Sequence, residues 1–193
     1  MNKFSLIVIP VLAALSACGG GGSTTGGASY SDREAVALNL ASDLESLGYS
    51  DPASLPFTTG EVRYLGAIGA VDYYGDRIIG DLKMNVRFAD SSMSGTADNF
   101  IDSYNDRYTG SLAITNGFID RTADTDVEYT FVADVDGVLS ANGFNTVVDA
   151  LMLGDFTGTS QQGMIGILDG TATTPGLGTT FLDFENTAFA AAK

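Results

Sequence analysis

The chain has one thiol, no histidine and many carboxylates, and these facts restrict the chemistry it can perform. Histidine is the usual general base for serine and cysteine nucleophiles and the commonest metal ligand, so its absence argues against both kinds of site. Two carboxylates are enough for glycoside hydrolysis, and Asp120, Asp124, Asp126 and Glu128 lie close together in the sequence. Among 24 acidic residues such neighbours are expected by chance. We therefore expect neither an enzyme nor a metal site.

The single cysteine, Cys18, follows a short basic start, Met1–Lys3, and an apolar run from Phe4 to Leu15. This layout is typical of a secretory signal, because the run is too short and too lightly flanked for a transmembrane helix. Leu15-Ser16-Ala17-Cys18 resembles the lipobox of bacterial lipoproteins. The resemblance implies cleavage before Cys18 and acylation of its sulfur and its new amine by palmitate-type chains. Two or more chains are sufficient for stable membrane anchoring.

A glycine- and serine-rich segment at residues 19–29, GGGGSTTGGAS, separates this cysteine from the rest of the chain. It contains no large apolar side chain, so we expect a flexible tether. In the enterobacterial lipoproteins that this region resembles, an aspartate directly after the cysteine is a signal for retention in the inner membrane. This chain has Gly19 at that position, and we therefore expect it in the outer membrane.

One amphipathic helix is expected after the tether. Ser31 and Glu34 form a capping box pattern, Gly48 supplies a C-cap, and the helix is predicted over Asp32–Leu47. Its apolar stripe consists of residues that recur at spacings of four, four and three positions, namely Val36, Leu40, Leu44 and Leu47. Such a stripe has to be covered. We expect it to dock on the following domain, and a partner protein is the alternative.

From about Gly60 the hydrophobic period changes to two, which is typical of half-buried antiparallel strands. Polar and apolar residues alternate over Asp81–Phe88 and again over Asp126–Val135, so we expect Leu82, Met84, Val86, Phe88, Tyr129 and Phe131 to point into one core. Weaker patterns predict strands near Glu61–Ala70, Met93–Ile101, Thr109–Thr115, Val147–Thr157 and Gly163–Asp169, with a possible eighth at Thr179–Phe184. Glycines inside these strands favour a curved barrel. Periodicity alone does not distinguish a barrel from a sandwich.

Three glycine-containing motifs occur in one order in this chain: Gly60-Glu61-Val62-Arg63-Tyr64-Leu65-Gly66, then Val86-Arg87-Phe88 through Ser94-Gly95-Thr96, then Gly154-Asp155-Phe156-Thr157-Gly158 with Gly163–Gly166. With the lipidated cysteine and glycine tract, they resemble the transferrin-binding protein B-like β-barrel surface lipoproteins. The resemblance covers about residues 60–169 and implies a mainly β fold, an antiparallel up-and-down barrel of about eight strands preceded by the amphipathic helix. The chain is too short for the two lobes of full-length transferrin receptors.

The expected organisation is a signal peptide at 1–17, a lipidated tether at 18–29, a helix and connector at 30–59, a barrel domain at 60–172, and a C-terminal segment at 173–193 that is available to complete the barrel. The net charge of −15 argues against nucleic acid as a partner. Relatives in the resembling family bind proteins or haem. As haem ligands, a phenolate could come from Tyr64, Tyr73, Tyr74, Tyr104 or Tyr108 and a thioether from Met84 or Met164. Most of these are better explained as core or interface residues, since Tyr64 and Met84 fall on apolar strand faces, so we expect no bound cofactor.

The expected function is non-catalytic binding of a macromolecule, or of an iron or haem source, at the cell surface. A small barrel fills its interior with side chains, so we expect the site in loops at one barrel end. The candidate loops are Asp72–Arg77, Ile101–Tyr108 and Asp120–Asp126, with Tyr73, Tyr74 and Tyr108 as anchors. The alternative is a periplasm-facing structural or assembly lipoprotein of the outer membrane.

Overall fold

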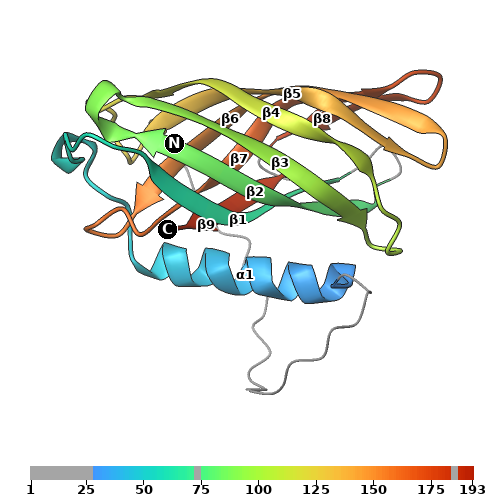
Figure 1. Ribbon diagram of the computed structural model, residues 1–193, viewed down its shortest axis with the longest axis horizontal. Helices are drawn as coiled ribbons and strands as arrows, with labels where there is room; N and C mark the ends of the chain where they lie inside the picture. Colours follow the sequence, from blue (N-terminus) through green and yellow to red (C-terminus); the bar gives the residue numbers. More distant parts are fainter. Residues whose placement is uncertain (1–27, 72–74, 184–186) are drawn as a thin grey trace.

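The protein is a mainly β structure with one long helix, as the computed structural model shows for residues 28–71, 75–183 and 187–193 (Figure 1). The signal, Cys18, Tyr73 and Tyr74 lie outside these described residues. The elements, in chain order, are α1 (Tyr30–Ser46), η1 (Pro52–Ser54), β1 (Val62–Val71), β2 (Arg77–Arg87), η2 (Phe88–Asp90), β3 (Ser92–Asp102), β4 (Thr109–Ile119), β5 (Phe131–Ala141), β6 (Phe144–Thr157), β7 (Gly163–Thr174), β8 (Gly178–Leu182) and β9 (Ala188–Ala192).

The strands form a closed antiparallel barrel with one extra strand. Each of β1 to β6 pairs with the next strand, and β9 then joins β7 to β1, which completes a ring of eight. The extra strand is β8, which pairs with the C-terminal half of β7. The expected barrel is therefore confirmed. The strand that closes it is the alanine-rich β9, whereas the segment expected to do so forms β8.

Alternation places the apolar residues of the strands inside the barrel. Leu82, Met84 and Val86 are at most 1% exposed, and between them Lys83 faces outward, where it pairs with Asp98 at 2.9 Å. Phe88 is buried as expected, but it lies in the short helix η2 after the strand ends.

The expected inward position of Tyr129 is wrong. The strand β5 begins only at Phe131, and Tyr129 is half-buried in the β4–β5 connection. Asp124 explains the late start, because its carbonyl oxygen accepts the backbone N–H groups of Val127 and Glu128 at 2.9 and 2.7 Å. These bonds close a turn where the alternating pattern predicted a strand.

Aromatic rings fill one half of the interior, which we call the packed end. The ring of Phe156 lies 5.2 Å from those of Phe88 and Phe131 and 6.2 Å from that of Tyr64. Gly154 makes room for this cluster, because a Cβ there would lie 2.6 Å from the Phe131 ring and 2.5 Å from a backbone oxygen. The in-strand glycines of the sequence thus have a packing role.

Helix α1 lies along the side of the barrel, against β1, β2, β7 and β9 (Figure 1). Leu44 packs with Ile165 and Ala190 near one end of the helix, and Tyr30 packs with Ile79 and Ile101 near the other. No helix of the described residues is long and apolar enough to cross a membrane.

Two expectations for this helix are corrected. Its capping box is formed by Ser29 and Asp32, two residues before the predicted one. The expected glycine at its C-terminal end is confirmed, because Gly48 follows Leu47 with a φ of +69°. Val36 and Leu47, expected in the apolar stripe, are 69% and 44% exposed. The docked face instead contains Tyr30 and Ala37 together with Leu40, Ala41 and Leu44, so only Leu40 and Leu44 of the expected stripe face the barrel.

Candidate functional site

Four connections form one end of the barrel, which we call the mouth. Successive antiparallel strands run in opposite directions, so every second connection lies at the same end of the barrel. The connections at the mouth are β1–β2, β3–β4, β5–β6 and β7–β8. Of the three expected binding loops, 101–108 belongs to the mouth, and so do residues 75–77 of the first, whose residues 72–74 lie outside the described part. The third, Asp120–Asp126, lies in the β4–β5 connection and therefore at the packed end, so the expectation of a single three-loop site is wrong.

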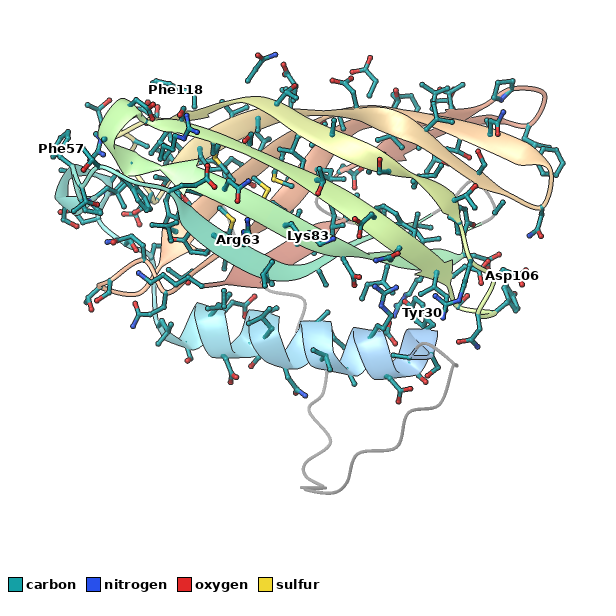
Figure 2. All side chains as sticks on the ribbon, viewed as in Figure 1. Tyr30, Phe57, Arg63, Lys83, Asp106 and Phe118 are labelled. Carbon is teal, nitrogen blue, oxygen red and sulfur yellow. The ribbon has the colours of Figure 1, made fainter. Side chains whose placement is uncertain are left out.

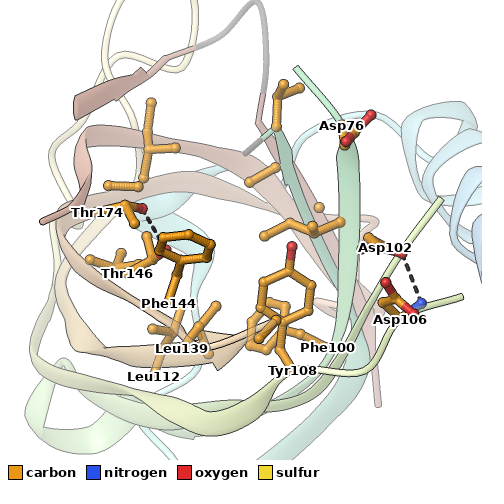
Figure 3. A pocket seen from close by; sticks show the side chains of 18 of the residues that line it. Asp76, Phe100, Asp102, Asp106, Tyr108, Leu112, Leu139, Phe144, Thr146 and Thr174 are labelled. Atoms are coloured by element: carbon orange, nitrogen blue, oxygen red, sulfur yellow. Dashed lines mark hydrogen bonds between the residues drawn. The ribbon is translucent and has the colours of Figure 1, made fainter. Parts of the chain in front are cut away.

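A cavity of about 340 Å³ opens at the mouth (Figure 3). Its wall is mainly aliphatic and comes from every part of the barrel, including Ile68, Leu112, Leu139, Leu168 and Ala172. The expectation that side chains leave little room for a ligand is therefore wrong at this end. The ring cluster around Phe156 fills the packed end, whereas at the mouth aliphatic and aromatic side chains surround an open space.

Two aromatic side chains reach into the cavity from its rim. Figure 3 shows the hydroxyl of Tyr108 and the ring of Phe144 directed into the enclosed space. Tyr108 is half-buried and packs against the barrel core, while Phe144 is 44% exposed at the start of β6. The cavity thus has an aromatic entrance above an aliphatic floor.

The polar groups of the cavity are hydroxyls and carboxylates. The hydroxyls of Thr146 and Thr174 lie 2.8 Å apart across β6 and β7. Asp102 is 5% exposed, and its Oδ1 accepts the N–H groups of Tyr104 and Asp106, both at 2.9 Å. These bonds fold the β3–β4 connection over the rim. Asp76 and Asp106 complete the acidic part of the lining.

The N-terminus of α1 is held at the same end of the barrel. The backbone N–H of Tyr30 donates to Oδ1 of Asn105 in the β3–β4 connection at 2.9 Å, and Figure 2 places Tyr30 and Asp106 together at this end, away from Phe57 and Phe118. The hydroxyl of Tyr30 donates to Glu34. Burial, and then this carboxylate, raise the pKa of Tyr30 to about 12. The expected tether therefore joins the domain beside the mouth.

Of the side chains considered as haem ligands, Tyr104 and Tyr108 line the cavity, whereas Tyr64 and Met84 do not. Met84 is fully buried in the barrel core. Tyr64 is also fully buried, and its hydroxyl donates to the carbonyl of Gln161 at 2.9 Å, near the packed end. Burial also raises the pKa of Tyr64 far above its ordinary value.

Of the anchors expected from the sequence, Tyr108 lines the cavity, and Tyr73 and Tyr74 lie outside the described residues. Sequence reasoning missed Phe144, Leu139 and Ala172. The signal for Phe144 was present, since it directly follows the Asn142-Gly143 turn. The expected function placed the site in exposed loops, and so the inward residues beside that turn were not considered.

A second acidic region lies on the outer wall. Asp134 and Asp136 of β5, Asp149 of β6 and Asp169 of β7 gather around a shallow depression there. Asp136 stands directly opposite Asp149, an arrangement that is unfavourable for like charges. No group of three or more acidic or cysteine side chains in the described ranges is arranged to hold a metal ion.

Comparison of the chain with protein-family models, curated proteins and solved structures found no match.

Proposed function

We propose that this protein is a non-catalytic binding protein, anchored to the outer membrane through lipid on Cys18, and that the mouth cavity holds a small apolar ligand. The observation that supports this most is the cavity itself. Its volume of about 340 Å³ falls in the range of roughly 300–1,000 Å³ that is usual for small-molecule sites. Like those sites, it combines an apolar wall with a few polar groups at its rim.

The position of the anchor supports a ligand that comes from the cell envelope. The expected tether has the twelve residues 18–29, which span at most about 40 Å when extended and about 20 Å on average if they behave as a glycine-rich coil. It enters α1 at Tyr30, beside the mouth. A lipidated Cys18 would therefore keep the cavity close to the membrane surface.

A macromolecular or haem-bearing ligand at the cell surface is the second candidate. Tyr104 favours it, because this side chain is 71% exposed at the mouth and exposed tyrosines are typical of protein-binding surfaces. The resemblance to the transferrin-binding protein B-like lipoproteins points the same way and stays a proposal. Protease treatment of intact cells separates this second candidate from a periplasm-facing structural or assembly role, for which the domain would be fully protected.

Filling the cavity tests the proposed function. Ala172 is an inward-facing wall residue on β7, and Thr171, its neighbour, lies on the outer face. We expect Ala172→Phe to weaken binding of the neutral fluorescent probe N-phenyl-1-naphthylamine at least tenfold, because the new ring occupies the ligand space. Thr171→Phe is the matched control and should bind normally. All three proteins are the mature chain with Cys18→Ser. Equal binding by the two phenylalanine variants, or no binding by the chain without either of them, would contradict the proposal.

The anchor has its own test in cells. Cys18→Ala removes the sulfur that would carry the lipid, so the domain should move from the membrane fraction to the soluble fraction, or its processing should stall. Mass spectrometry of the protein that keeps Cys18 should detect acyl chains on this residue. Unchanged membrane association together with an unmodified cysteine would refute anchoring.

A further inference from the structure

Resting on the proposed ligand cavity, we propose that its ligand is a small amphiphile with an apolar body and a positively charged head group. The proposal concerns the charge that the mouth selects, which the size and apolar wall of the cavity do not determine.

In the part of the chain that the structure describes, every charged side chain that lines the cavity is a carboxylate. Asp76 precedes β2, Asp102 ends β3 and Asp106 follows in the β3–β4 connection. Figure 3 shows all three on one side of the opening, across from Thr146 and Thr174. A head group at this side of the rim would meet several negative charges, while the tail lies between the apolar walls.

Among the described residues, no basic side chain lines the cavity. Arg77 faces outward, 3.1 Å from Glu34 of α1, and its side chain is 69% exposed. Arg107 is exposed and is absent from the lining.

The carboxylates differ in how far their own contacts occupy them. Asp102 holds the β3–β4 connection through two backbone N–H groups. Asp106 accepts a long bond of 3.4 Å from the amide of Asn142 across the mouth. Ionised carboxylates only accept hydrogen bonds, so an ammonium group matches this rim. A carboxylate or phosphate head would meet repulsion, strengthened by the apolar surroundings.

The experiment compares three ligands with one ten-carbon body: decylamine, decanol and decanoate. Each is titrated by calorimetry, below its micelle concentration at pH 7, into the mature chain with Cys18→Ser. We expect decylamine to bind at least tenfold more tightly than decanoate, with decanol between them. Raising the salt concentration should reduce the difference, because screening acts on the exposed part of the interaction.

Two pairs of substitutions locate the effect. Asp76→Asn with Asp106→Asn should bring the affinity for decylamine down to that for decanol. The control is Asp136→Asn with Asp149→Asn, which removes the same charge from the outer wall and relieves a like-charge pair. The control should keep the preference for decylamine. If it loses the preference equally, the net charge of the protein, and not the mouth, is responsible and the inference is overturned.

The outcomes separate this inference from the proposed function. If decanoate binds as tightly as decylamine to the unmodified mouth, the charge selection is wrong and the cavity remains a binding site. If none of the three ligands binds, the proposed function fails with it. The ligand comparison needs no substitution at the mouth, so it stands even if the Asp76 and Asp106 pair of substitutions lowers stability.

Discussion

Phe156 is the residue whose loss should most clearly reveal the packed end of the barrel. It is fully buried and its ring contacts those of Tyr64, Phe88 and Phe131. Truncating a buried phenylalanine to alanine costs about 3–5 kcal/mol from lost transfer energy and the cavity left behind. Three ring pairs, at roughly 0.5–1.5 kcal/mol each beyond area burial, place Phe156→Ala at the upper end of that range.

The measurement is urea denaturation followed by far-UV circular dichroism and tyrosine fluorescence. A matched control is Phe57→Ala, since Phe57 is 72% exposed and its ring meets only one described cation, Arg121, at 3.9 Å. Its loss should cost about 0.5–1 kcal/mol. If the two variants lose the same free energy of unfolding, the aromatic cluster does not hold this end of the barrel together and the description of the packed end is wrong.

Three further predictions concern stability. Tyr64→Phe should make the free energy of unfolding fall less steeply between pH about 10 and 12. Burial raises the pKa of Tyr64, so the folded state keeps a phenol proton that the unfolded state releases, and stability is full below the unfolded pKa and falls as the pH rises. An unchanged pH dependence of the free energy of unfolding would count against this. Arg33→Ala should lower the free energy of unfolding by about 1–2 kcal/mol, since this partly buried arginine binds a carboxylate and a carbonyl of the barrel wall. The control is Arg87→Ala, which should cost less than about 1 kcal/mol because the Arg87 side chain is 61% exposed. Equal losses would refute a role of Arg33 in docking α1 on the barrel. Gly154→Ala should cost about 1–3 kcal/mol through overpacking, while Gly69→Ala, whose new Cβ meets nothing within 3.7 Å, should be nearly neutral; thermal melts compare the two.

The sequence was sufficient to predict the barrel wall where alternation is unbroken. Leu82, Met84 and Val86 lie inside because a period of two assigns each side chain to one face. The same pattern failed at Tyr129, where the Asp124 turn takes the chain out of the sheet. Alternation measures only side-chain polarity, so it does not detect a backbone turn that begins within it.

The closing strand and the cavity were harder to predict, for different reasons. β9 consists almost wholly of alanine, so it has no alternation. It fits there because α1 covers its outer face through Leu44 and Ala190. The cavity depends on which side chains meet inside the barrel: Phe131, Phe156 and Phe189 pack against one another at one end, whereas Tyr108 and Phe144 line an open space at the other. That arrangement follows from register, and the sequence does not give register.

The most direct test of the ligand cavity is an NMR measurement on the mature chain with Cys18→Ser, labelled at its leucine and isoleucine methyl groups and titrated with decylamine. The account predicts contacts between the decyl chain and the methyl groups of Ile68, Leu139 and Leu168 inside the mouth. Leu151, which is 41% exposed on the outer wall, should not change. Contacts with Leu151 in place of the three interior residues would contradict the central claim.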